Sequence, residues 1–356
     1  MKIKKNHEKF TIVPKLFSLT TNVDILPHFI LGPFMYDFYP KGETKLNFSY
    51  IVKKDIEKPP ELDTKLEYFW GKNGDNRIYY EHPFLGKIKL KMLVERQGDN
   101  YHFLVNGPYH KYIKDVMGRI RKPELYLQDA AVLSFSNIGF TILHGACVAK
   151  DEKGTLIFGS PKSGKSSISY SLLKKGYNLL CDDSVVLGPI NSYATSSRSP
   201  YFVKRFTGKE KNNKWSQKYY NLFHTIPIIS SLFSLFGSQT TSFFNSFREA
   251  SNSIGVIDKV KVNRIFILEK GEKEIIKISS VDALRKIIIL TRPSSFYFND
   301  AFLQAFFYFN PEIDINLIIR KEEEIILSLV NRSECYLLKA NSPSDYINLL
   351  DQIINI

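Results

Sequence analysis

The segment from Gly154 to Leu187 constrains the fold of this chain more than any other, because it contains a complete phosphate-loop motif. Residues 159–166 read G-S-P-K-S-G-K-S and fit the pattern G-x-x-x-x-G-K-[ST] at every fixed position. The apolar residues 155–158 before it predict a strand, and residues 165–175, which contain neither glycine nor proline, predict a helix. Gly176 follows where a left-handed helix cap belongs. Strand, loop and helix in this order are the context that the motif requires.

The motif predicts nucleotide binding for physical reasons. Backbone N–H groups between Gly159 and Gly164 can face one concavity, and the start of the following helix adds partial positive charge there. Lys165 can reach the β- and γ-phosphates, and the Ser166 hydroxyl can ligate Mg²⁺. The nucleotide-binding residues that we expect are Gly159, Ser160, Pro161, Lys162, Ser163, Gly164, Lys165, Ser166 and Ser167.

Composition and charge narrow the class of protein and its partners. The formal net charge of +13 suits an anionic ligand, but the basic residues do not form one long block, and we expect no nucleic-acid partner. Cys147, Cys181 and Cys335 are far apart and lack C-x-x-C spacing, which argues against a disulfide framework or a zinc site. We find neither a signal peptide nor a clean apolar run of membrane-spanning length, and we expect a cytoplasmic location.

The pattern of the chain predicts two domains. Residues 1–120 are β-rich, with short strands expected at 29–31, 45–52, 77–80, 88–94 and 101–105, and we interpret them as an accessory or recognition domain. Residues 121–356 form the expected catalytic domain, with an insertion or lid at about 190–255. The uncharged stretch 219–247 within it is either a lid or docking surface, or a buried helical pair or oligomer contact.

Around the phosphate loop the sequence predicts an α/β arrangement. A helix over 124–137 leads into one strand, 141–149, which contains His144 and forms a hairpin with the strand before the loop. In the C-terminal third we expect strands at 264–269, 275–278 and 335–339 and helices at 281–290, 300–309, 314–330 and 343–354, the last capped by Ser342.

Two adjacent aspartates follow the predicted strand 178–181. Asp182 and Asp183 thereby lie at its carboxyl end, where an open parallel sheet binds ligands. One carboxylate can hold Mg²⁺, and the other can accept the proton of an attacking hydroxyl, as an aspartate does in kinases. Two neighbouring carboxylates repel each other unless a metal and Lys165 neutralise them, which favours a functional role. The alternative for either residue is an ordinary turn or helix cap.

The run from 143 to 187 is similar to the core of the HPr kinase/phosphorylase family and its wider kinase relatives. The shared features are a His-Gly before the loop, the loop itself, a basic-Gly-Tyr turn and an Asp-Asp-x-Val strand end. His144 lies 21 positions before Lys165, Asp183 lies 18 positions after it, and both spacings match the family without a gap.

The resemblance implies a fold and a set of roles. The fold is a P-loop catalytic domain of the HPr kinase/PEP-carboxykinase-like type, preceded here by the β-rich domain. The loop would hold the phosphates of ATP, with Ser166 and Asp182 at Mg²⁺ and Lys165 neutralising the transferring phosphoryl group. Asp183 matches the residue that accepts the proton of the acceptor serine, and His144 matches a histidine that supports it. Taken without the resemblance, His144 is more simply a strand histidine. The family also often forms homo-oligomers.

The sequence also departs from that family. Ser167 stands where these enzymes usually have Glu, and neither the L-E-I-R-G segment nor the C-terminal substrate signature is recognisable. The acceptor is therefore open, and a protein, a peptide and a small molecule all fit. We expect an ATP- and Mg²⁺-dependent kinase that phosphorylates a hydroxyl, serine first. The alternatives are a regulatory P-loop NTPase without an acceptor, a catalytically silent scaffold, and a kinase of free serine or a sugar.

Overall fold

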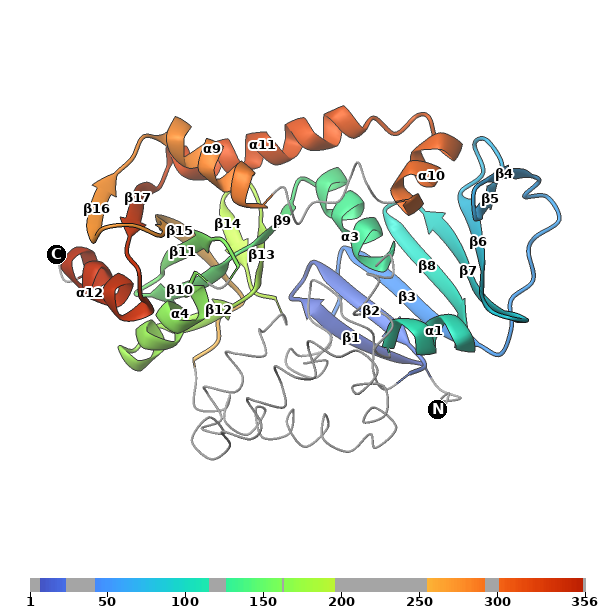
Figure 1. Cartoon of the computed structure of the whole chain (residues 1–356), viewed down its shortest axis with the longest axis horizontal. Coiled ribbons are helices and arrows are strands. Elements are labelled where there is room, and N and C mark those ends of the chain that lie inside the picture. The colour runs from blue at the N-terminus through green and yellow to red at the C-terminus, as the bar shows by residue number, and fades with distance from the viewer. Residues whose placement is uncertain are drawn as a thin grey trace. The chain divides into compact units, whose positions relative to one another are not determined.

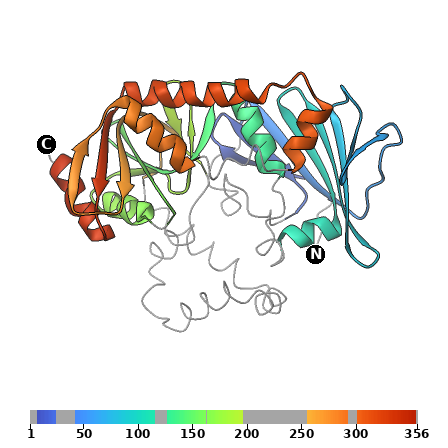
Figure 2. The same cartoon turned by 45° about the horizontal axis from the view of Figure 1, so that its top comes forward.

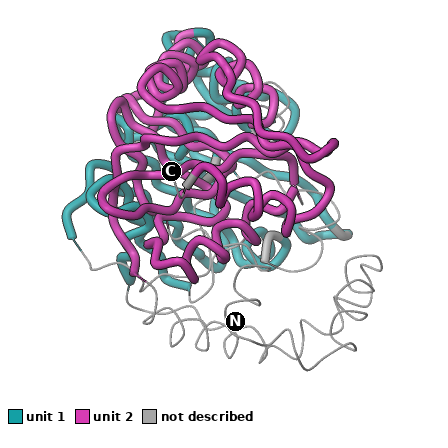
Figure 3. Tube along the Cα trace, turned by 90° about the vertical axis from the view of Figure 1, so that its left-hand side faces the viewer, with its two compact units in different colours: residues 1–134, 211–244, 297–316 teal, residues 135–210, 245–296, 317–356 magenta. Residues whose placement is uncertain are grey.

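The structure is a computed structural model, and it describes residues 7–23, 42–114, 126–161, 163–195, 255–291 and 301–354 (Figure 1). The chain divides into two compact units, shown in different colours in Figure 3. Unit 1 comprises 1–134, 211–244 and 297–316, and unit 2 comprises 135–210, 245–296 and 317–356. The expected lid lies largely outside the described residues, as do the stretch 219–247 and the predicted strand 29–31. The predicted domains, 1–120 and 121–356, stay a prediction.

Unit 1 is built on an eight-stranded sheet with the order β1-β2-β3-β8-β7-β6-β5-β4. The pairs β2–β3 and β3–β8 are parallel, and the other neighbours are antiparallel. Its strands are β1 (Glu8–Val13), β2 (Phe17–Thr21), β3 (Leu46–Lys53), β4 (Thr64–Leu66), β5 (Phe69–Gly71), β6 (Arg77–Leu85), β7 (Ile88–Gln97) and β8 (Asn100–Asn106). β3, β6, β7 and β8 correspond to four strands that the sequence predicted.

The core of unit 1 is aromatic and includes a helix from the distant end of the chain. Helix α10 (Ala301–Phe309) lies in the segment that the sequence assigned to the second domain. The Phe302 ring is 4.8 Å from the ring of Tyr126, in helix α3 (Tyr126–Asn137), and Phe306 is 5.8 Å from Tyr101. A β-carbon on Gly71 would come within 2.5 Å of the Phe309 ring, so a glycine is needed where α10 meets β5.

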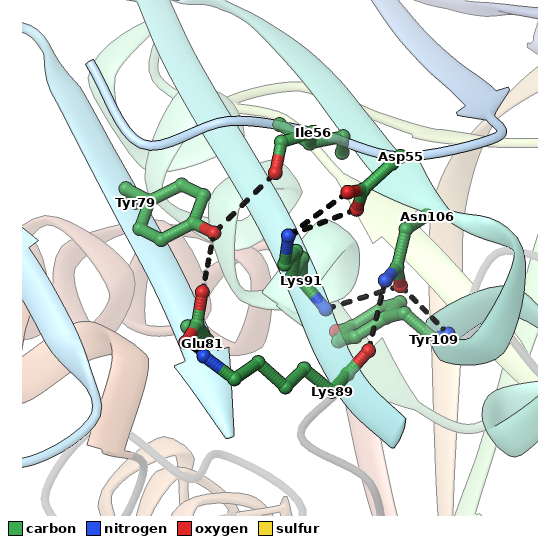
Figure 4. A network of polar contacts seen from close by, with 8 residues as sticks. All are labelled: Asp55, Ile56, Tyr79, Glu81, Lys89, Lys91, Asn106 and Tyr109. Carbon is green, nitrogen blue, oxygen red and sulfur yellow. Dashed lines mark hydrogen bonds and ion pairs between the residues drawn. The ribbon is translucent and has the colours of Figure 1, made fainter. Parts of the chain in front are cut away.

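A polar network joins β6, β7 and β8 to helix α1 (Gly107–Lys114), as Figure 4 shows. Asn106 is its centre: its carboxamide oxygen accepts from the backbone N–H of Lys91 (3.1 Å) and of Tyr109 (2.9 Å). The amide nitrogen donates to the Lys89 carbonyl at 2.8 Å. Asn106 therefore ends a strand, caps the next helix and pairs with a neighbouring strand, a role that suits an N-cap asparagine.

Unit 2 contains a nine-stranded mixed sheet, and the prediction of a mixed α/β fold is confirmed (Figure 2). The path β12-β10-β11-β15-β14-β13-β9 is extended by β17, which pairs with β15 and β16. The strands are β9 (Thr141–His144), β10 (Ala146–Lys150), β11 (Lys153–Gly159), β12 (Asn178–Cys181), β13 (Ser184–Leu187), β14 (Asn191–Tyr193), β15 (Lys259–Glu269), β16 (Glu274–Lys277) and β17 (Glu334–Lys339).

One expectation about this sheet is corrected. The predicted strand 141–149 is two strands, because the chain breaks at Gly145: β9 pairs with β13, whereas β10 pairs with β11 and β12. The Gly145 N–H donates to the Asp183 carbonyl at 3.1 Å instead of to a sheet neighbour. The sheet is mixed, and β10 runs antiparallel between β11 and β12. The predicted hairpin into the loop is confirmed as β10–β11.

Helices cover both faces of this sheet. In Figures 1 and 2, α4 (Lys165–Lys174) and α12 (Pro343–Ile354) lie side by side on one face, and α9 (Ser280–Thr291) covers the other. Helix α11 (Ile315–Asn331) completes the described helices of this part of the chain. Within the described residues, no helix is both long and apolar enough to cross a membrane.

Candidate active site

The loop after β11 is tightly wound, and its glycines are required by the space around them. A β-carbon on Gly159 would stand 2.5 Å from Ser163 Oγ and 3.0 Å from Leu268 Cβ, so only glycine lets the loop close here. Gly164 has φ 105°, a conformation that L-residues rarely adopt. Together they hold residues 159–161 and 163–164 in a tight turn that ends at the start of α4.

Two features beside this turn suit an anionic ligand. Helix α4 begins at Gly164 with no side-chain cap, and its first turn carries no acidic residue. Ser163 is buried, and its Oγ has no hydrogen-bond partner among the described residues. Backbone N–H groups at an uncapped helix start and a buried hydroxyl are the donors that phosphate oxygens use.

Lys165 is buried within the loop, with 6% of its surface exposed. Its ammonium donates to the carbonyls of Gly159 (2.8 Å) and Ser160 (3.1 Å). Burial lowers the pKa of Lys165, and the charges of Asp183 and Asp182 act in the opposite direction. The Lys165 ammonium therefore contacts the loop backbone and is influenced by the charges of both carboxylates.

The two aspartates at the end of β12 have different surroundings. Asp182 is 1% exposed, and its Oδ2 accepts a hydrogen bond from Ser166 Oγ at 3.2 Å. The Asp183 side chain is 40% exposed, and its Oδ1 lies 3.5 Å from His144 Nδ1. One carboxylate is thus buried against the first turn of α4, while the next one faces β9 and remains accessible.

His144 is placed by the strand pairing rather than by a loop. It ends β9 opposite Ser184 of β13, the residue that follows the aspartate pair. Burial lowers the pKa of His144, nearby Asp183 partly offsets this, and the charge of Lys165 lowers the pKa further. The neutral imidazole is therefore favoured at neutral pH, beside an accessible carboxylate.

The structure brings most of the expected site residues together. The contacts above join Gly159, Ser160, Ser163, Gly164, Lys165, Ser166, Asp182, Asp183 and His144. Pro161 lies in the turn and is exposed, Ser167 is buried in the first turn of α4, and Lys162 lies outside the described residues. In the described ranges, no group of three or more His, Cys, Asp or Glu side chains gathers as a metal site.

One contact at this site was missed from the sequence. Pro343 Cγ lies 3.5 Å from the point where a β-carbon on Gly164 would stand, so the start of α12 adjoins the phosphate loop. The predicted strand 335–339 and helix 343–354 are the sequence features that could have indicated this contact. β17 runs parallel to β15, and β15 runs parallel to β11, so the loops that follow these strands share one edge.

Comparisons with known proteins point to HPr kinases as similar proteins. No family model matches the chain. An HPr kinase/phosphorylase of Chromobacterium violaceum is 30% identical over 169 residues, which are 45% of this chain and 49% of that protein. The chain therefore spans about half the length of this curated relative.

A solved structure of an Hpr(Ser) kinase/phosphatase from Coxiella burnetii has 19% sequence identity and covers 38% of this chain and 69% of that chain, at a TM-score of 0.20. A phosphate loop followed by an aspartate pair is an arrangement that phosphoryl-transfer enzymes use. More particularly, the matched part of the chain is similar to HPr kinase/phosphorylase.

Proposed function

We propose that this protein is an ATP- and Mg²⁺-dependent kinase that transfers the γ-phosphate to a hydroxyl, that of a serine first. The observation that carries this proposal is the division between the two aspartates. Asp182 is buried against Ser166 of the phosphate loop, and Asp183 is accessible beside His144. A kinase needs one group for its metal and another for its acceptor, and two adjacent carboxylates supply both.

The residues of the site fit both the phosphates of ATP and Mg²⁺. The closed turn at Gly159, the buried Ser163 hydroxyl and the uncapped start of α4 fit a chain of phosphates. Ser166 Oγ and Asp182 Oδ2 are hard oxygen donors 3.2 Å apart, which is the chemistry that Mg²⁺ prefers. When bound, Mg²⁺ would neutralise phosphate charge and thereby weaken the repulsion between ATP and the two aspartates.

In the proposed reaction, Asp183 takes the proton of the acceptor hydroxyl as the acceptor oxygen bonds to the γ-phosphorus. The bond between that phosphorus and the β–γ bridging oxygen breaks, and ADP leaves with the electron pair. Lys165 supplies fixed positive charge where negative charge collects on the phosphoryl oxygens. His144 holds the Asp183 carboxylate on the side of β9, at 3.5 Å, and contributes no charge when neutral.

The acceptor is proposed only as a class. The relative from Chromobacterium violaceum is an HPr kinase/phosphorylase. A serine hydroxyl of a protein is accordingly the first candidate here, with peptides and small molecules next. We also propose a cytoplasmic location, where ATP and Mg²⁺ are available.

The proposal is tested by following labelled γ-phosphate from ATP into a lysate of the producing organism, with phosphoamino-acid analysis of the product. Asp183→Asn should abolish transfer and leave binding of the ATP analogue AMPPNP, measured by calorimetry, within about two-fold, because the carboxylate acts on the acceptor. The matched control is Asp258→Asn, at an exposed aspartate of the same unit, which should transfer like the wild type.

Two results would overturn this reading. Wild-type turnover by Asp183→Asn would show that another group takes the proton. Label that moves only to free phosphate, in every fraction of the lysate, would favour a regulatory NTPase instead. Label in an acid-stable phosphoserine that is absent with Asp183→Asn would support the kinase.

A further inference from the structure

The parallel strands of unit 2 indicate where a nucleotide can extend from the phosphate loop. The aspartates lie between β12 and β13, and β12 is separated from β11 by β10, whereas β15 and β17 lie on the side of β11 away from β10. The reacting phosphate belongs near Asp183, at the end of β12. The nucleoside, at the opposite end of the phosphate chain, then extends over the ends of β15 and β17.

The loop that follows β17 lies at this end of the strands. It runs from Lys339 to Pro343, the first residue of α12, and Pro343 adjoins Gly164 as described above. The loop is held firmly at its base: the N–H of Ala340 donates to the Glu269 carbonyl at 3.1 Å, and the Tyr346 hydroxyl donates to the same carbonyl. These bonds tie the loop to the end of β15.

One side chain of this loop has no hydrogen-bond partner within the described part of the chain. Asn341 is exposed, and within the described part of the chain its carboxamide makes no hydrogen bond. Its neighbours are engaged: Ala340 is buried, and Ser342 caps α12 by accepting from the N–H of Asp345 at 3.2 Å. A fixed backbone thus presents one amide, which carries both a donor and an acceptor.

We propose that Asn341 and Pro343 form the adenine subsite of this protein, with Asn341 reading the base and the Pro343 ring supporting it. The proposal rests on the proposed function. The adenine edge offers an N6 amino donor beside a ring-nitrogen acceptor, and a carboxamide matches that pair, whereas guanine offers two acceptors at the same positions. Pro343 adjoins the phosphate loop at Gly164 and ends the loop that follows β17. Its ring therefore suits the position between the phosphates and the base.

The test compares three probes by calorimetry with the full chain in Mg²⁺: AMPPNP, its guanine counterpart GMPPNP, and inorganic tripolyphosphate. Asn341→Ala should weaken AMPPNP binding about ten-fold, which removes most of the preference over GMPPNP, and should leave tripolyphosphate unchanged. Asn341→Asp keeps the size of the side chain but loses the donor, and should weaken AMPPNP to a similar extent. Pro343→Ala should weaken both nucleotides by a few-fold and tripolyphosphate not at all.

The control is Asp351→Asn, at the far end of α12, where the side chain pairs with Lys175 of the α4 C-terminus. It should leave all three probes unchanged, which excludes a general effect of loosening α12. Unchanged AMPPNP binding in both Asn341 variants would overturn the subsite, and so would an equal loss for AMPPNP and tripolyphosphate.

Failure of the proposed function gives a different result. If wild-type protein does not bind tripolyphosphate, or if Lys165→Met binds it as well as the wild type, the phosphate site itself is wrong. If tripolyphosphate binding depends on Lys165 while the Asn341 variants behave as the wild type, the phosphate site stands and only the adenine subsite falls.

Discussion

Helices α4 and α12 lie side by side and begin next to each other, yet their first turns are built in opposite ways. In α12, Ser342 Oγ accepts from the N–H of Asp345 at 3.2 Å, and the Asp345 carboxylate accepts from the same hydroxyl at 2.6 Å. In α4, Gly164 provides no side-chain cap, and the first turn carries Lys165 in place of an acid. One helix start therefore has a side-chain cap, and the other has none among the described residues.

This difference separates a structural helix start from a functional one. A side-chain cap stabilises a helix by about 1 kcal/mol, and an acidic residue in the first turn adds to this. Helix α4 has neither a side-chain cap nor an acidic residue in its first turn. Its buried Lys165 lies where the helix dipole disfavours positive charge. An anion bound at α4 would reverse each of these disadvantages. At α12 the same anion would be repelled by the Asp345 carboxylate, and the helix start would already be capped by Ser342.

The largest effect is expected from removing the cation of α4. Lys165→Met should reduce phosphoryl transfer about 10²- to 10³-fold, because a fixed charge aimed at the phosphoryl group is lost. Folding should be preserved or improved, since burial disfavours the ammonium and methionine is apolar and of similar length. Turnover by label transfer and the midpoint of thermal unfolding without nucleotide are the two measurements.

Lys174→Met supplies the matched control, because Lys174 lies in the last turn of the same helix, away from the loop. It should transfer phosphate like the wild type. If Lys165→Met both unfolded at a much lower temperature and kept its turnover, Lys165 would be a structural residue, and the contrast between the helix starts would have no functional meaning.

The next effect comes from exchanging each helix start for alanine. Gly164→Ala forces an L-residue to φ 105°, so we expect about 1–3 kcal/mol of lost stability together with weaker tripolyphosphate binding. Ser342→Ala removes a cap, so we expect about 1 kcal/mol of lost stability and unchanged tripolyphosphate binding. Urea unfolding and calorimetry measure the two quantities on each variant.

The comparison fails if the pair behaves alike. Weaker tripolyphosphate binding by Ser342→Ala would mean that α12 also serves the phosphates. Unchanged binding by Gly164→Ala would mean that the conformation of Gly164 does not shape the phosphate site.

Much of this contrast could be predicted from local sequence, because caps and loops are local structures. The motif predicted the strand 155–158, the loop and the helix that begins at Lys165, and Ser342 was predicted as the cap of the last helix. Gly176 was predicted as a left-handed cap, and its φ is 83°. Each of these features depends on residues within a few positions of one another.

What the sequence did not reveal depends on pairing between distant segments. The break at Gly145 follows from a hydrogen bond to Asp183 and from the Phe158 ring, which would lie 3.0 Å from a β-carbon at Gly145. A strand pattern cannot show such a neighbour. For the same reason, neither the placing of α10 in unit 1 nor the approach of Pro343 to Gly164 was predicted. The division of the aspartate pair into a buried and an accessible carboxylate also required the structure.

The smallest expected effect is electrostatic and concerns only the site at α4. Its charged and titratable groups are His144, Asp183, Asp182 and Lys165, whereas α12 begins with no histidine. Burial lowers the pKa of His144 below its ordinary value of 6.5 in the folded state. Above pH 6.5 the imidazole is neutral in both states, so His144 adds no pH dependence there. As the pH falls below 6.5, the unfolded chain takes up a proton that the folded state resists, so stability must decrease.

Thermal unfolding of the nucleotide-free protein at pH 7.5 and pH 5.5 measures this contribution. The wild type should lose more stability between these values than His144→Asn, because asparagine does not titrate. The effect is small, since the neighbouring Asp183 carboxylate offsets part of the penalty that burial imposes on the imidazolium. His102→Asn is the control, at a half-buried histidine of unit 1. An equal loss in wild type and His144→Asn would show that His144 is not held in its neutral form, and that the accessible aspartate has a cation beside it when the acceptor arrives.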